Sequence, residues 1–214
     1  MKIILPFFCI FLLTACSLIS PVEVSKEEVL KRAIIRSTTS DGFLMNGTGA
    51  VTFKQGAAHR TARFSFTGSV LPLRHAYSLT IAVPKKRIVV ASPGLATPAV
   101  PDPVLIDAYF TAIHVDHSTL VRLSRTSFAY VLSVRLLSEA AADDLSISGK
   151  LRIDAKTFAL LHADWKLINV LPESDSSELL FSASLSEAFV GSIAQTSTGT
   201  VVLSEAIFDM ILAE

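Results

Sequence analysis

Cysteine is scarce in this chain, because Cys9 and Cys16 are the only two among 214 residues. Both lie near the start, so the rest of the chain has no thiol for a disulfide, a nucleophilic site or a cysteine-ligated metal. An excess of one charge is also missing, since 19 basic residues balance 19 acidic ones. Such a chain offers no predominantly basic face, and we expect no nucleic-acid partner.

Sequence motifs of several enzyme classes are missing as well. After residue 16 there is no GxxxxGK[ST] nucleotide loop, no GxSxG nucleophile elbow and no SxxK pair. The strongest candidate for a metal centre is the group His114, Asp116 and His117, because two histidines and a carboxylate bind zinc when they converge. We favour a polar helix end and turn for this stretch, and predict no metal, no cofactor and no enzymatic activity. A metal-assisted hydrolase using His114 and His117 is the alternative enzyme hypothesis.

The sequence does contain a short hydrophobic segment at its start. Ile3–Leu13 is an almost unbroken apolar run preceded by Lys2. It is shorter than the roughly 20 residues of a membrane-spanning helix and is typical of a signal-peptide core. Residues 13–16 read Leu-Thr-Ala-Cys, which resembles the lipobox of bacterial lipoproteins. The resemblance implies that residues 1–15 are removed and that Cys16 is lipidated.

This resemblance also implies a location. A lipid on Cys16 would hold the chain in the bacterial cell envelope through a tether at residues 16–24. Ser17 follows the cysteine where an aspartate would resemble an inner-membrane retention signal, so we expect the periplasmic face of the outer membrane. Residues 25–214 then form a single domain.

The chain is unusually apolar for a soluble domain. Hydrophobic residues make up 50% of it, charged residues only 18%, and the mean hydropathy is +0.52. The leader accounts for part of this excess. The remainder indicates either a large core or an internal surface lined by hydrophobic side chains.

A helix is predicted at about Lys26–Arg36. Ser25 is a suitable N-cap, and Glu28 three residues later would complete a capping box. Further helices are predicted over 103–113, where Asp102 precedes a proline, and from Ser204 to the end of the chain.

Between these helices the hydrophobic period is two, which is typical of β-strands with one buried face. Gly47 and Gly49 fall on the apolar face of the first strand, where they allow it to bend. The order of helix, four strands, helix and four or five strands predicts an α+β domain with a strongly curved antiparallel sheet. The strands are expected at residues 43–53, 63–70, 77–84, 87–92, 128–136, 145–154, 159–170, 178–190 and 198–203.

This order of elements resembles the lipoprotein-localisation superfamily, the LolA/LolB-like proteins. The similarity spans about Lys26–Leu203 and includes the N-terminal helix, "MNGTGAVTF" and "RIVVASPG". It implies an unclosed β-barrel covered by two or three helices over a hydrophobic cavity. The resemblance also implies a function: a lipid-anchored protein that binds or carries an acyl chain, a lipid or a lipoprotein.

Two hypotheses besides the enzyme therefore stay open. In the first, the apolar half-barrel binds a hydrophobic ligand; in the second, a packed core supports a structural or assembly module with an envelope-protein partner. The residues expected to line a cavity are Phe64, Phe66, Leu79, Ile81, Phe128, Tyr130, Leu132, Trp165 and Phe181.

Overall fold

The structure is a computed structural model of the chain that describes residues 24–72, 76–83, 86–92, 112–136, 146–169 and 174–188. Several predicted segments lie outside these residues: the leader, most of the tether, the strand at 198–203, the helix from Ser204 and all but the last two positions of the helix at 103–113. Within the described residues, no helix has the length and apolar character needed to cross a membrane.

The one helix in the described part of the chain is α2 (Lys26–Thr38), which confirms the first predicted helix and ends slightly later. Ser25 caps it as expected, since its hydroxyl accepts a hydrogen bond from the Glu28 N–H at 3.2 Å. The Glu28 side chain does not act as the predicted capping box requires. Its carboxylate accepts a hydrogen bond from Arg32 one turn further on, at 2.6 Å.

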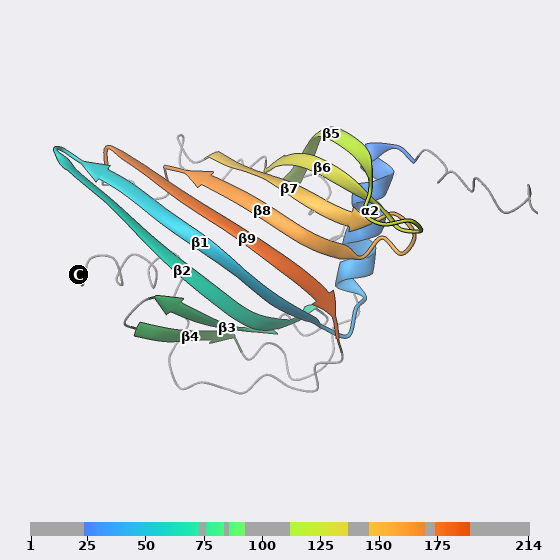
Figure 1. The fold of residues 1–214 in the computed structure, drawn as a ribbon, viewed down its shortest axis with the longest axis horizontal. Coiled ribbons are helices and arrows are strands. Elements are labelled where there is room, and N and C mark those ends of the chain that lie inside the picture. The colour runs from blue at the N-terminus through green and yellow to red at the C-terminus, as the bar shows by residue number, and fades with distance from the viewer. Residues whose placement is uncertain are drawn as a thin grey trace, which may run out of the picture.

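In the described residues, nine strands form one antiparallel sheet, coloured along the chain in Figure 1. Their bounds are β1 Phe43–Gln55, β2 Ala58–Leu71, β3 Ala76–Val83, β4 Lys86–Ser92, β5 Ile113–Arg122, β6 Phe128–Leu136, β7 Ser146–Asp154, β8 Leu160–Ile168 and β9 Ser176–Glu187. The strand order is β4-β3-β2-β1-β9-β8-β7-β6-β5. Two meanders are thus joined by the pairing of β1 with β9, in a register that places Gly49 opposite Phe181.

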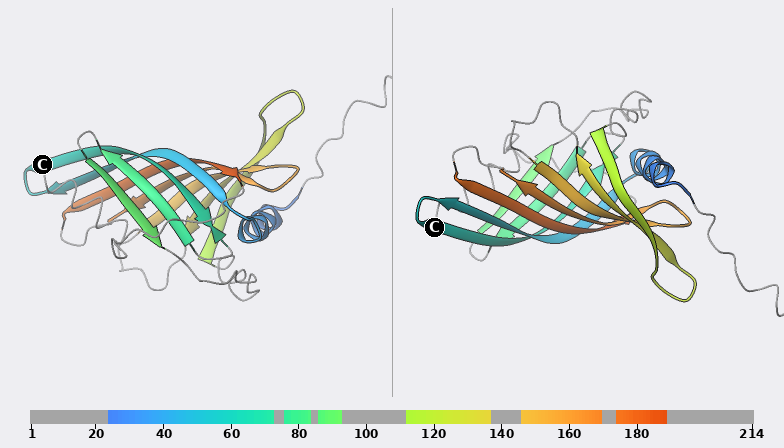
Figure 2. Two further views of the ribbon diagram at one scale, coloured as in Figure 1. Left: turned by 90° about the horizontal axis from the view of Figure 1, so that it is seen from below. Right: turned by 90° about the horizontal axis from the view of Figure 1, so that it is seen from above.

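The sheet curls around its apolar face (Figure 2). Its two end strands, β4 and β5, are not paired with each other in the described structure, so the barrel is unclosed. This confirms the predicted strongly curved antiparallel sheet. One of the two or three predicted helices lies in the described part of the chain.

Alternation along the strands separates the two faces of the sheet. Val51 and Leu179 lie opposite each other on the concave face and are buried. Their neighbours Thr52 and Glu178, also paired, lie on the convex face. The period of two read from the sequence therefore places the apolar residues on the inner side of the curve.

Strand β5 was not predicted, and its presence corrects the expectation of a helix end and turn at His114–His117. The register of β5 against β6 shifts between Val115 and His117, so an extra residue, Asp116, sits in a bulge. A bulge reverses the phase of the alternation within a strand. The period of two is consequently interrupted, and Ile113, predicted as the last helical residue, begins the strand.

Two clusters of buried side chains form the core in the part of the chain that the structure describes. The first belongs to the β1–β3 and β9 region and includes Phe64, Phe66 and Ile81. The second lies where α2 packs on the concave face of β5–β8, with Leu30 against strand residues such as Leu132. The helix therefore covers only one end of the apolar face (Figure 2).

Candidate functional site

Glycines on the concave face allow aromatic rings to lie flat against the sheet. A Cβ atom at Gly49 would lie only 2.1 Å from Cζ of Phe64, so the Phe64 ring occupies the space above this glycine. On β7, a Cβ atom at Gly149 would lie 2.7 Å from Cε3 of Trp165. Rings that cover the sheet in this way do not project into the hollow that its curvature creates.

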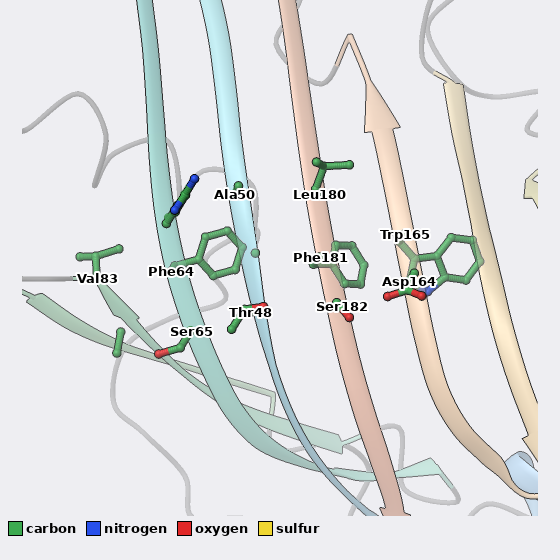
Figure 3. Close-up of a pocket in the computed structure, with 13 residues that line it drawn as sticks. Thr48, Ala50, Phe64, Ser65, Val83, Asp164, Trp165, Leu180, Phe181 and Ser182 are labelled. Atoms are coloured by element: carbon green, nitrogen blue, oxygen red, sulfur yellow. The ribbon is translucent and has the colours of Figure 1, made fainter. Parts of the chain in front are cut away.

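A cavity of about 800 Å³ lies above these rings. Its wall includes Gly49, Phe64, Val83, Trp165 and Phe181, which come from five different strands. Figure 3 shows Phe64, Phe181 and Trp165 side by side across β2, β1, β9 and β8. The cavity therefore has a continuous aromatic floor.

The polar residues around this cavity are the strand neighbours of the apolar ones. Thr48, Ser65 and Ser182 each stand next to a concave-face residue and belong to the convex face by alternation. The charged residues of the wall, Arg63 and Asp164, occupy the same alternating positions, next to Phe64 and Trp165. The site is consequently suited to bury apolar surface rather than to bind a polar group.

A second cavity, of about 540 Å³, lies between α2 and the sheet. Leu30 and Ile34 of the helix line it on one side, and Phe43 and Met45 of β1 line it on the other. Trp165 lines both cavities. The indole therefore stands at the boundary between the covered and the open part of the concave face.

The structure brings three of the nine predicted lining residues, Phe64, Trp165 and Phe181, together around the larger cavity. The other six lie on the same face of the sheet but do not line either cavity. These are Phe66, Leu79 and Ile81 in or against the first core cluster, Tyr130 and Leu132 in the second, and Phe128 next to the turn of the β5–β6 hairpin. They are covered by the protein's own side chains to differing degrees.

Sequence reasoning missed ten of the thirteen residues that line the larger cavity, and two of these, Gly49 and Val83, lie on the concave face. Val83 is the last apolar position in the alternating run of β3. The alternation of apolar and polar residues could have identified it as a concave-face residue. Gly49 was identified only as a residue that allows bending. Its second role follows from the pairing of β1 with β2, which sets Gly49 opposite Phe64 and was not predictable from local sequence.

The convex face carries a polar cluster around His162. Its Nε2 lies 3.0 Å from Oδ1 of Asp164 and 3.1 Å from the Ser182 hydroxyl, while Nδ1 lies 3.2 Å from the Ser184 hydroxyl. Partial burial raises the pKa of Asp164, but hydrogen bonds from Ser182 and His162 outweigh it and leave that pKa below its ordinary value. The cluster lies on the polar face that the period of two gives this strand.

Of the residues considered for a metal centre, His114 lies with its Nε2 3.5 Å from Oδ1 of Asp116, while Asp116 and His117 also have other partners. Asp116 accepts hydrogen bonds from Arg135, with its two oxygens 2.8 and 3.0 Å from Nε, and this pairing lowers the Asp116 pKa. His117 Nε2 lies 2.9 Å from the Thr119 hydroxyl. Among the described residues, no three histidine, cysteine, aspartate or glutamate side chains gather as metal ligands.

Comparison with known proteins gives distant structural neighbours. No family model matches the chain, and no curated protein matches it. A LolA superfamily protein of Nitrosomonas europaea is 12% identical, with 78% of this chain and 96% of that one covered and a TM-score of 0.27. A domain of an outer membrane lipoprotein-sorting protein of Vibrio parahaemolyticus is 7% identical, with 86% and 97% covered and a TM-score of 0.27.

A DUF1329 family protein of Desulfovibrio piger is similarly distant, at 11% identity with 78% of this chain and 95% of that one covered and a TM-score of 0.25. Scores and identities this low do not establish the function of the chain. Its function has to be argued from its own geometry.

Proposed function

We propose that this protein is a non-enzymatic, lipid-anchored envelope protein that binds or carries a hydrophobic ligand on the concave face of its half-barrel. The ligand is an acyl chain or a lipid that carries one. The observation that supports this most directly is the cavity of about 800 Å³ floored by Phe64, Phe181 and Trp165. Its volume lies within the roughly 300–1,000 Å³ of small-molecule binding sites.

The chemistry of the wall favours an apolar ligand without directional contacts. Each methylene group moved from water into such a cavity contributes about 0.8 kcal/mol. Several methylenes are therefore enough for a useful affinity, and the site needs no buried charge or hydrogen-bonding group. We therefore expect the site to discriminate ligands by the length of their acyl chain more than by their head group.

Residues 1–23 provide the second part of the proposal. Lipidation of Cys16 would attach the domain to a bilayer, on the periplasmic face of the outer membrane. A single acyl chain holds a protein only reversibly, whereas two or more hold it stably. The protein would then act at a membrane surface from which its ligand is taken.

Trp165 makes binding directly measurable, because it is the only tryptophan in the chain and lines the cavity. Energy transfer from Trp165 to a dansyl-labelled long-chain fatty acid should appear on titration and disappear when unlabelled fatty acid competes. Native mass spectrometry of the protein purified from its own membranes should detect co-purified lipid. Absence of both signals would refute ligand binding.

A matched pair of variants on β3 tests the location. Val83→Phe adds volume inside the cavity and should weaken binding of the dansyl fatty acid. Thr80→Val changes a residue of the same strand on the convex face and should leave binding unchanged. Equal effects of the two substitutions would show that the ligand is not bound on the concave face.

A further inference from the structure

The hairpin of β5 and β6 projects past the end of the sheet, at the end where α2 lies (Figure 2). Two large hydrophobic side chains are exposed on it: Leu120 has 41% and Leu123 has 44% of its surface accessible. Arg122 and Arg125 alternate with them and are also exposed. Other exposed leucines, such as Leu44, lie within the sheet, whereas these two share a projecting hairpin with exposed arginines, so the tip combines apolar and basic surface.

The tip of this hairpin is held in one conformation. The Ser124 hydroxyl accepts hydrogen bonds from the N–H groups of Thr126 and Ser127, at 3.3 and 3.2 Å. The Arg122 guanidinium donates to the carbonyls of Ser124 and Arg125, both at 2.9 Å. Leu123 is therefore presented by a rigid turn, which lowers the entropy lost on binding.

The tip is also positively charged. Neither Arg122 nor Arg125 forms an ion pair with any acidic side chain in the described residues. Arg122 lies with its Cζ 5.9 Å from the centre of the Phe128 ring, which fixes the charge close to apolar surface. In a membrane interface, exposed leucines can contact the acyl chains while neighbouring arginines contact anionic headgroups. The tip has both kinds of side chain.

The position of α2 fits the same partner. Lys26 Nζ donates to the carbonyl of Val115 on β5 at 2.8 Å, which fastens the start of the helix to the strand that leads to the tip. From Val115 to Arg122 the strand extends about 23 Å at its usual rise. Residues 17–24 reach at most about 28 Å. A lipid on Cys16 and the tip can thus meet one membrane plane.

We infer that the β5–β6 tip, residues 120–125, is a second membrane contact that inserts Leu123 into the interface of an anionic bilayer and orients the cavity towards it. The orientation rests on the proposed lipid anchor, whereas contact of the tip with lipid does not. The two are therefore testable separately.

The experiment uses the mature chain from residue 16 with Cys16→Ser, which has neither a lipid nor a cysteine. Leu123→Cys then supplies a unique site for an NBD fluorophore, and Leu44→Cys supplies the matched control, since Leu44 is an exposed leucine on the convex face of β1. Vesicles of phosphatidylcholine with and without phosphatidylglycerol are added to each labelled protein.

We expect the emission of the label at position 123 to shift to the blue and rise with the anionic vesicles, and to revert at high salt. The label at position 44 should not respond. No response at position 123, or equal responses at both positions, would overturn the inference. A change at position 123 that depends on protein concentration without vesicles would replace the membrane by a second copy of the chain.

Substitutions separate this contact from ligand binding. Leu123→Ser should weaken partition into anionic vesicles about fivefold by removing one apolar side chain from the interface. Arg125→Gln should weaken it about fivefold on anionic vesicles only, since one cation near such a surface contributes about 1 kcal/mol. Both variants should bind the dansyl fatty acid normally. Unchanged partition of both variants would refute the role of the tip, even if the cavity binds lipid.

Discussion

The substitution Gly49→Ala tests how the cavity is kept open. A Cβ atom at this position would lie 2.1, 2.6 and 2.7 Å from three carbons of the Phe64 ring. Carbon atoms in contact are about 3.5–4.0 Å apart, so the ring has to move by about 1.5 Å. The strand lies beneath the ring, and the open direction is the cavity.

The expected consequence is a loss of affinity with modest destabilisation. A ring displaced far enough to exclude two methylene groups of a ligand weakens binding by about 1.6 kcal/mol, which is about 15-fold in Kd. Overpacking of this kind costs roughly 1–3 kcal/mol of folding stability. Titration with the dansyl fatty acid gives the first quantity, and urea unfolding gives the second.

Two further variants decide whether the ring is responsible. Thr52→Val changes a residue of the same strand that lies on the convex face and does not line the cavity, so this variant should bind like the wild type. Phe64→Leu removes the ring, so the double variant Gly49→Ala/Phe64→Leu should bind within about twofold of Phe64→Leu alone, a non-additivity expected only for residues in contact. A folded Gly49→Ala protein with wild-type affinity, or additive effects in this cycle, would refute the reasoning.

Three other predictions concern stability and the anchor. Leu132→Ala should lower the free energy of unfolding by about 2–5 kcal/mol because this side chain is fully buried, whereas Leu44→Ala, at an exposed site, should change it by less than about 0.5 kcal/mol in the same urea titration. Burial raises the pKa of Asp154, but hydrogen bonds from Thr157 and Lys156 outweigh it and hold that pKa below its ordinary value. The stabilisation by this carboxylate is therefore complete above the unfolded pKa of about 3.9 and is lost as pH falls through the lower folded value, so acid titration should show the advantage over Asp154→Ala disappearing below about pH 4. Cys16→Ser should release the protein from the membrane fraction and abolish labelling by a radioactive fatty acid, and retention of either property would refute the anchor.

Local sequence determined the secondary structure of most of the described chain. The Ser25 cap and the apolar stripe of Val29, Leu30 and Ala33 specify α2. The alternation of apolar and polar residues specifies eight of the nine described strands, β5 being the exception. Both features can be read from neighbouring residues, since an N-cap bonds a backbone N–H up to three residues away and strand side chains alternate with a period of two. Strand β5 escaped because the bulge at Asp116 interrupts its period, and a bulge is defined by the partner strand.

Only the tertiary structure decided which residues form the cavity. The sequence placed nine candidates on one face, but the arrangement of the strands and of α2 brings only three of them to the wall of the larger cavity. Gly49 acquires its function from Phe64 on a neighbouring strand. Packing between segments far apart in sequence is set by curvature and register, which no single strand encodes.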